Sequence, residues 1–431
     1  MALPSLRVEI DFSSGPSFGY PFLLDDAAYG ILDNNILADA PSDVVDITSQ
    51  VRRVSTRRGR NRILANFEAG TATVVLNDPN SDFNPQNPSS PYYGKLLPLR
   101  KIRIYANTTS GGSPVSINIF SGYITSYDTS FYQGTNEDAT VTLQCVDGFR
   151  LLANVSTDIP PVPGCPAGQL SGARIQALLD YADWPTSSTD LAVGNSTMMA
   201  DPGGVRSILQ AIQTVEQSEF GAFFMSRGGR AIFLNRELVS ELADVPPYLY
   251  TDESPLPANS YPYANVDFAY DDQLVLNDVT VTRYNDGTIP APVPQIVIDQ
   301  DSVDKYFYKS GQRTDLLMQT DGEALDQAQM LVASRKNADL RIDSMVLNLN
   351  SDIDETNTLT NLSLDIYTLI NITKEMPGGS TVTRELFVQG VRNDVTPGQW
   401  IMTIYTAEPI IQAFILDSTT QGILDTNSLT Y

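Results

Sequence analysis

The sequence of 431 residues contains no histidine, and this absence excludes several kinds of chemistry. A Ser-His-Asp triad, a Cys-His pair and a histidine-ligated zinc site all need an imidazole. Paired carboxylates are therefore the acid–base chemistry that remains. Because 51 residues are acidic, close pairs arise by chance. We expect three such pairs to be solvated loop charges: Asp271 with Asp272, Asp299 with Asp301, and Asp352 with Asp354.

Cysteine is scarce as well. Cys145 and Cys165 are too few for a disulfide framework or a four-thiolate metal site. Cys145 belongs to the alternating run Val141, Leu143, Cys145, so we expect it to be a small buried hydrophobe. Cys165 lies in a turn-rich, proline-rich stretch, and a bridge between the two cysteines stays open at this stage. We interpret the chain as made in a reducing cytoplasm.

Basic residues and long apolar runs are also few. The chain has 27 basic and 51 acidic residues, which gives a formal charge of −24. Specific nucleic-acid binding needs clustered positive charge, and an acidic chain is repelled by phosphate and anionic lipid. No run approaches the roughly 20 apolar residues of a membrane helix, and the N-terminus lacks a signal-peptide pattern. We expect neither specific nucleic-acid binding nor membrane insertion.

Turn-forming residues are abundant, with 28 glycines and 27 prolines. Between the turn signals, apolar residues alternate at period 2 and predict short strands at 6–12, 69–76, 101–106, 115–123 and 139–146. This density of short strands is typical of a small antiparallel barrel or sandwich. Further strands are predicted at 279–283, 295–299, 344–349, 366–372, 381–391 and 399–405.

Helical spacing appears only after Asn154. One helix is predicted with Ser171 as its cap, and a second from Asp201-Pro202 with an apolar stripe from Val205 to Val215. A Gly-Gly turn then predicts a hairpin over 222–234. Thr320 and Glu323 form a capping box that begins a third helix.

These elements predict a mainly β chain with an α+β insert, in which two small antiparallel β-barrels flank a helix-containing middle region. The expected segments are an N-terminal strand and docking segment (1–44), a first β-barrel (45–155), a helix–helix–hairpin domain (156–245), a strand-and-loop domain ending in a helix (246–340), a second β-barrel (341–410) and a C-terminal docking segment (411–431).

Two segments near the ends of the chain repeat each other. Residues 22–37 align without gaps with residues 414–429, and nine of sixteen positions are identical. The glycines suit a turn with positive φ, and the aspartates can close Asx turns. Cation binding by these aspartates is the alternative, although their spacing matches no calcium loop. We expect both segments to be docking elements, with contact residues Phe22, Leu24, Asp25, Gly30, Leu32, Asp33, Phe414, Leu416, Asp417, Gly422, Leu424 and Asp425.

A cluster of arginines is unusual in so acidic a chain. Its members are Arg52, Arg53, Arg57, Arg58, Arg60 and Arg62. The cluster is interpreted either as a solvated loop, as a docking surface for an acidic partner or neighbouring copy, or as a nucleic-acid contact. We take the arginines as interface candidates.

Two patterns resemble functional motifs but depart from them. Gly15-Pro-Ser-Phe-Gly19 has the spacing of a nucleophile elbow, yet no histidine exists to activate Ser17. The run that begins at Asp78 departs from a calcium loop at Phe83 and Ser89. We assign no catalytic, cofactor-binding or metal-binding residue.

Several motifs together resemble those of a known family. Residues 57–78 contain an R-G-R segment and the pattern F-x-A-G-T-A-x-V-x-L, followed by Phe83-Asn-Pro85. The segments at 90–93, 99–104, 120–124 and 396–400 continue the likeness. The chain resembles the minor tail proteins of long-tailed bacteriophages, most clearly over about 45–150 and more weakly over about 320–431.

The resemblance implies a baseplate-hub-like fold and a structural role as a tail hub. Such hubs are trimeric rings in which two barrels per subunit present six similar surfaces to a six-fold tube. The implied partners are two further copies, the distal tail protein, the tape-measure protein and tail tip or fibre proteins. DNA passes through the bore without specific binding. The implied location is the virion tail tip, after synthesis in the host bacterial cytoplasm, with no enzyme activity and no cofactor.

Two other interpretations stay open. One alternative is a distal tail ring, for which a six-fold assembly is diagnostic, or a carbohydrate-binding tail tip protein, for which a groove with exposed aromatic side chains is diagnostic. A third interpretation is a cell-wall glycosidase, which needs two carboxyls roughly 5–10 Å apart in a cleft.

Overall fold

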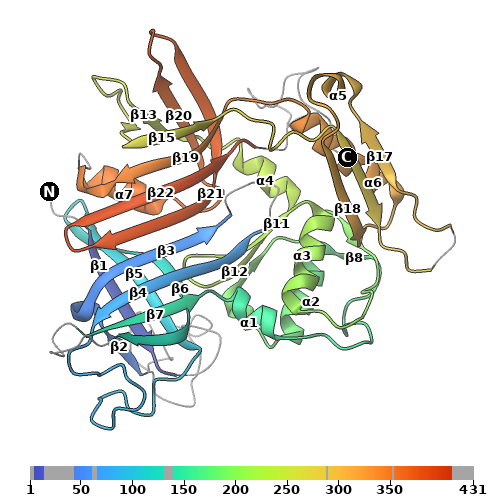
Figure 1. The fold of residues 1–431 in the computed structure, drawn as a ribbon. Helices are drawn as coiled ribbons and strands as arrows, with labels where there is room; N and C mark the ends of the chain where they lie inside the picture. Colours follow the sequence, from blue (N-terminus) through green and yellow to red (C-terminus); the bar gives the residue numbers. More distant parts are fainter. Residues whose placement is uncertain are drawn as a thin grey trace.

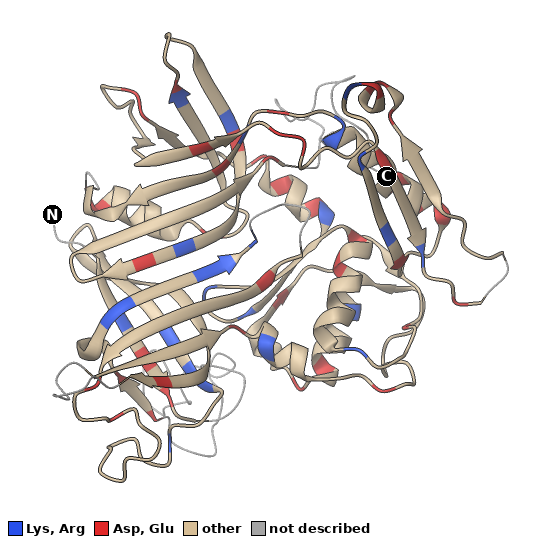
Figure 2. Ribbon diagram, viewed as in Figure 1, with Lys and Arg blue, Asp and Glu red and all other residues tan. Residues whose placement is uncertain are grey.

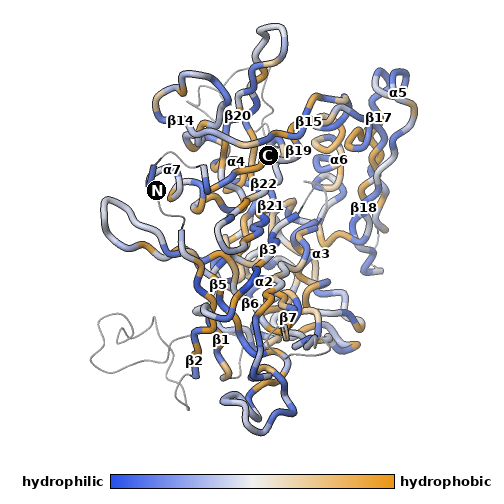
Figure 3. The backbone as a smooth tube through the Cα atoms, turned by 60° about the vertical axis from the view of Figure 1, so that its left-hand side comes forward, coloured by the Kyte–Doolittle hydropathy of each residue, from blue (hydrophilic) through white to orange (hydrophobic). Residues whose placement is uncertain are grey.

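The computed structural model describes residues 4–13, 43–60, 66–130, 139–287, 290–351 and 354–409. The described chain is mainly β, as the sequence predicts. One large sheet and helix α7 (Glu355–Ser363) occupy one side of the molecule, and the other helices with three smaller sheets lie on the other side (Figure 1). Hydrophobic stretches follow the strands in the middle of the molecule, whereas hydrophilic stretches gather in its outer loops (Figure 3).

The N-terminal half of the large sheet is antiparallel, and strands distant in sequence, such as β4 and β7, pair within it. Its order is β3-β4-β7-β6-β5-β1-β2. A short 3₁₀ turn, Thr48–Gln50, precedes β3. Alternate residues of β7 face the core, as the run Val141, Leu143, Cys145 predicts. The strands are β1 (Ser5–Asp11), β2 (Val44–Asp46), β3 (Val51–Gly59), β4 (Glu68–Asn77), β5 (Arg100–Ser110), β6 (Ser113–Ser130) and β7 (Thr140–Val146).

The C-terminal half is built from strands that flank the middle region in sequence. Its order is β15-β19-β22-β21-β20-β13-β14, and β13 runs parallel to both of its neighbours. Helix α7 (Glu355–Ser363) packs against β5 of the other half. The strands are β13 (Tyr248–Thr251), β14 (Ser260–Tyr261), β15 (Asn265–Ala269), β19 (Arg341–Asn348), β20 (Leu369–Glu375), β21 (Thr381–Thr396) and β22 (Gln399–Ala407). A 3₁₀ turn, Leu349–Ser351, follows β19.

The two halves are joined where β3 pairs with β21, at the centre of Figure 1. This antiparallel pairing runs from Val54 opposite Val395 to Gly59 opposite Gly390, and we call it the seam. It makes one sheet of 14 strands. A single hydrophobic core contains buried residues of both halves, such as Leu143 and Ile404. The two segments expected as barrels are therefore joined through the seam and share one core.

The middle region has its own core, formed by helices and the predicted hairpin. Helix α2 begins at Ser171, but this residue does not cap it, because its hydroxyl donates to Glu219 (3.0 Å). Helix α3 begins at Ile208 rather than near Asp201. The elements are α1 (Phe149–Asn154), β8 (Gln169–Leu170), α2 (Ser171–Tyr181), a 3₁₀ turn (Thr186–Ser188), β9 (Thr189–Leu191), β10 (Thr197–Met198), α3 (Ile208–Glu219), β11 (Ala222–Met225), β12 (Ala231–Leu234) and α4 (Arg236–Leu242).

The start of α3 was predicted wrongly for a local reason. Ser207 and Gln210 form the capping box of this helix. Asp201 instead accepts hydrogen bonds from the backbone N–H groups of Val162 (3.0 Å) and Gly203 (3.1 Å). Val205, expected in the apolar stripe, is 72% exposed and lies before the helix.

A third, smaller unit consists of a three-stranded sheet covered on one face by a helix. Strand β16 (Asp278–Arg283) lies between β17 (Gln295–Ile298) and β18 (Ser310–Leu316). Helix α5 (Gln300–Tyr306) follows β17, and α6 (Asp321–Arg335) covers the sheet. The predicted capping box is confirmed: Thr320 Oγ1 accepts from the Glu323 N–H (3.2 Å), and the Glu323 carboxylate accepts from the Thr320 N–H (3.1 Å).

Both cysteines are buried free thiols, so the bridge that the sequence left open does not form. Cys145 lies in the core of the large sheet, as predicted, and Cys165 in the core of the middle region. Within the described residues, no helix is long and apolar enough to cross a membrane.

Candidate assembly surface at the seam

The arginine-rich segment forms strand β3, not a loop. Its first two arginines, Arg52 and Arg53, are exposed, Arg57 is partly buried, and Arg58 and Arg60 are buried. Figure 2 shows the basic colour along β3 in the middle of the large sheet. Arg62 lies outside the described residues. The segment predicted as a docking surface is thus also one side of the seam.

The two buried arginines bind groups of their own chain. Arg58 forms an ion pair with Asp365. Arg60 donates from Nε to the Gln389 side chain (2.8 Å) and from Nη2 to the Tyr367 hydroxyl (3.0 Å). Their guanidinium groups therefore fix β3 to β21 and to the segment before β20. The docking surface that we propose is limited to Arg52, Arg53 and Arg57.

The exposed arginines differ in the ion pairs that they form. Arg53 lies 3.6 Å from Asp394, and Arg57 lies 3.2 Å from Glu68. Both pairs are solvent-exposed and therefore weak. Arg52 makes no ion pair within the part of the chain that the structure describes. A free cation at this place is available to an acidic partner.

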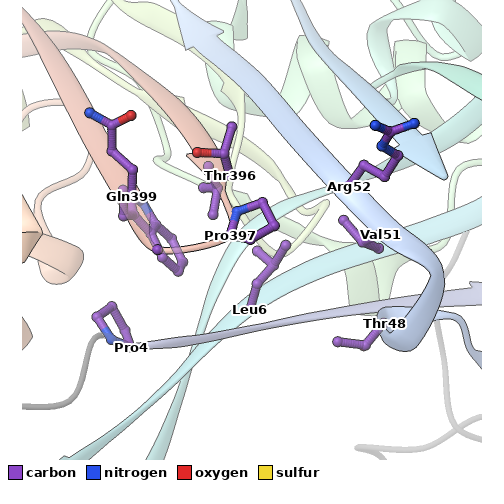
Figure 4. Close-up of a pocket in the computed structure, with 11 residues that line it drawn as sticks. Pro4, Leu6, Thr48, Val51, Arg52, Thr396, Pro397 and Gln399 are labelled. Atoms are coloured by element: carbon purple, nitrogen blue, oxygen red, sulfur yellow. The ribbon is translucent and has the colours of Figure 1, made fainter. Parts of the chain in front are cut away.

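A groove of about 210 Å³ opens beside Arg52 (Figure 4). Leu6 of β1 and Pro4, just before this strand, line it, and the turn between β21 and β22 contributes Pro397. Trp400 also lines it; this indole is buried and donates from Nε1 to Asn393 (3.0 Å). We call it the seam groove. Its lining is mostly apolar and contains no carboxylate, which does not suit a two-carboxylate hydrolase.

Two buried carboxyl groups lie close to the seam. Burial raises the pKa of Asp147 to about 7, although it accepts hydrogen bonds from the N–H groups of Gly70 (2.6 Å) and Phe149 (3.0 Å). Burial also raises the pKa of Glu216 to about 7, and it accepts from the Phe223 N–H (3.1 Å). Both carboxyls bind backbone in the interior, which indicates a structural role.

These two groups predict that the protein is more stable in mild acid. An unfolded carboxyl has a pKa near 4, so between about pH 4 and pH 7 the folded state binds more protons than the unfolded state. The free energy of unfolding therefore falls as pH rises through this window, by about 1.4 kcal/mol per pH unit for each group. Urea denaturation at pH 5 and pH 8 measures the difference.

The variant Glu216→Gln tests this prediction. Arg60 and Arg313 face Glu216, and its Oε2 has no hydrogen-bond partner within the described chain. The neutral amide keeps the acceptor for Phe223, so we expect a higher stability at pH 8 and a smaller change between pH 5 and pH 8. The exposed Glu253→Gln is the matched control. A wild-type stability that rises from pH 5 to pH 8 contradicts the prediction.

Most of the other acidic residues singled out in the sequence lie within the described residues and have partners in their own chain. Asp271 is partly exposed and is bound by Arg341 at 2.9 and 2.8 Å. Asp272 is exposed, as expected, and pairs with Lys309, whereas Asp299 caps α5 and Asp354 caps α7. Asp78 accepts from the N–H groups of Asp82 and Phe83, so it closes a turn. No group of three metal-ligand side chains occurs within the described residues.

The remaining candidates lie outside the described residues: Gly15–Gly19 of the G-x-S-x-G pattern, Asp352, and the repeat residues Phe22, Leu24, Asp25, Gly30, Leu32, Asp33, Phe414, Leu416, Asp417, Gly422, Leu424 and Asp425. Their role as docking elements stays a prediction.

Sequence reasoning missed the partners of the buried arginines. Asp365 and Tyr367 each lie 307 positions from the arginine that they bind, and no local signal marks them. The turn at Pro397-Gly398 was visible as a motif, but its place beside Arg52 was not. Both tryptophans are buried, so neither offers the exposed ring expected of a carbohydrate-binding groove.

The sequence matches no family model and no curated protein. Its fold, however, is found in solved tail proteins. The tail protein from Neisseria meningitidis MC58 has a TM-score of 0.55 at 11% identity, over 94% of this chain and 97% of that one. The 43 kDa tail protein of prophage MuSo2 from Shewanella oneidensis has a TM-score of 0.51 at 13% identity, over 84% and 95%.

The chain therefore has the fold of phage tail proteins. The resemblance that the sequence motifs indicated is confirmed at the level of the fold.

Proposed function

We propose that this protein is a structural component of a phage tail, the trimeric hub at the distal end of the tail tube. The observation that carries the proposal is the fold shared with a tail protein over 94% of this chain and 97% of the other.

The architecture suits an adaptor between two symmetries. Each chain contributes two sheet halves fused at the seam, so three copies present six halves to a six-fold tube and three chains to a three-fold tip. The formal charge of −24 keeps a central channel from holding the DNA that passes through it. We infer that the partners are the distal tail protein, the tape-measure protein and the tip or fibre proteins, at the tail tip of a virion assembled in the bacterial cytoplasm.

Cryo-EM class averages of the recombinant protein, with mass measured on the same sample, test the proposal. A three-fold ring with a central hole and a mass near 3 × 47.1, about 141 kDa, is expected. A six-fold ring overturns the hub in favour of the distal tail ring. A chain that stays monomeric at every concentration overturns the trimer.

Arg52 gives a sharper test of the docking surface. It is exposed beside the seam groove, and reversing its charge brings two like charges together if a neighbouring acidic chain binds there. We expect Arg52→Glu to weaken ring formation at least about tenfold, as measured by the mass distribution on dilution. Arg150→Glu on α1 is the matched control, because this arginine is exposed away from the seam. Equal effects of the two variants contradict the assigned surface.

A further inference from the structure

Strand β17 is an exposed edge with apolar side chains. Within the described residues it pairs with β16 alone. Val297 faces the core under α6, whereas Ile296 and Ile298 point away from it and are 60% and 48% exposed. Val293, just before the strand, is 56% exposed. One side of the small sheet thus ends in uncovered aliphatic side chains beside unpaired backbone groups.

This edge carries no charge. Natural sheets guard their edges with charges, prolines or short strands; prolines precede β17, but no charged residue occurs between Pro290 and Ile298. A strand with free N–H and C=O groups and apolar neighbours binds another extended segment readily. An extended segment with apolar side chains fits this edge best, because it supplies backbone hydrogen bonds and also contacts the exposed aliphatic side chains.

The described chain ends close to this edge. Glu408 lies 3.5 Å from Arg384 and interacts with the charge of Arg335, the last residue of α6. The next residue, Lys336, lies 3.1 Å from Asp299, which directly follows β17. Glu408, at the end of the described chain, therefore lies near the C-terminal end of α6, and the residue after that helix contacts the residue after β17.

The residues that follow have the matching chemistry. Residues 410–417 read Ile-Ile-Gln-Ala-Phe-Ile-Leu-Asp, an uncharged apolar run that ends in one aspartate. An extended residue spans about 3.3 Å, so four of them cover the length of β17. Attachment to the same chain gives this segment a high effective concentration at the edge.

We propose that residues 410–417 add a strand to the free edge of β17 in the same chain and cover Ile296 and Ile298. The added strand extends the three-stranded sheet to four strands. This inference does not depend on the hub function, because it holds for a single copy as well as for a ring.

Hydrogen exchange compares the full chain with a chain that ends at Pro409. We expect those amides of residues 295–298 that point away from β16 to exchange at least about tenfold faster after truncation, because the pairing strand is gone. Amides of the β11–β12 hairpin, which lies in the middle region, serve as the internal control. Unchanged exchange at β17 overturns the proposal.

Cysteine cross-linking identifies the copy that supplies the strand. Ile298→Cys is combined with a cysteine at each position from 412 to 416, and the oxidised proteins are separated under denaturing, non-reducing conditions. We expect bridges within single chains of 47.1 kDa. Val205→Cys replaces Ile298→Cys in the control for random collision, because Val205 lies outside the small sheet and is more exposed than Ile298 (72% against 48%). Bridges between two chains, or no bridge at any position, overturn the proposal.

Discussion

Gly59→Ala is expected to remove more than about 4 kcal/mol from the free energy of unfolding, which unfolds many proteins outright. Gly59 is the last residue of β3 and has a φ of +92°. A Cβ at this position would lie 2.2 Å from the Gln389 carbonyl oxygen and 2.6 Å from the Gly390 Cα. Both are backbone atoms of β21, so relief of the clash requires the seam to open.

Gly398→Ala separates the clash from the backbone strain. Gly398 has a φ of +85°, close to that of Gly59, but no atom of the described residues lies within 4 Å of the position that its Cβ would take. We expect the free energy of unfolding of this variant to fall by only about 1 kcal/mol, because alanine is less favourable than glycine at positive φ. Urea denaturation of both variants gives the difference directly. Equal losses contradict a close approach of β3 and β21 at Gly59.

Asp365→Ala is expected to lower the free energy of unfolding by about 3 kcal/mol. The Arg58 side chain is only 5% exposed and forms an ion pair with Asp365. Removal of the carboxylate leaves a buried cation without its partner, which is more unfavourable than the intact pair is favourable. Arg227, whose Nε lies 3.5 Å from Asp365, loses a contact as well. Chemical denaturation measures the change.

Glu68→Ala is the matched control for this variant. It removes the partner of Arg57, in a pair on the same strand whose side chains are 38% and 64% exposed. We expect a loss below about 1 kcal/mol. If both variants lose the same amount, the burial of Arg58 has no energetic consequence and the seam is not held by this ion pair.

The sequence was informative where structure depends on near neighbours. The alternation at Val141, Leu143 and Cys145 predicted a strand with one buried face, and β7 has this face. The capping box of Thr320 and Glu323 predicted the start of α6. In each case the residues that determine the local conformation lie within a few positions of one another.

The seam could not be predicted, because its determinants are far apart in the chain. Arg60 and Gln389 are separated by 329 positions, and neither carries a signal for the other. A run of arginines suggests solvent when it is considered alone. The pairing of β3 with β21 brings Gln389 to Arg60, and the segment before β20 supplies Asp365 to Arg58 and Tyr367 to Arg60.

Helix α7 was missed for a different reason. Its buried face contains Asn357, Thr358 and Asn361, so the apolar periodicity that predicts helices is weak. The Asn361 side chain donates to Asn357 (2.8 Å) and accepts from the Tyr250 hydroxyl (2.9 Å). Burial of this face depends on hydrogen bonds between side chains that the sequence does not pair.

The seam also determines how the molecule carries mechanical load. The antiparallel strands at the seam are linked by hydrogen bonds that lie perpendicular to their axes. A force along the strands loads all of these bonds at once, whereas a force across them peels the pairs apart one after another. Tension between the two sheet halves is therefore resisted strongly in one direction and weakly in the perpendicular one, so the protein is mechanically anisotropic.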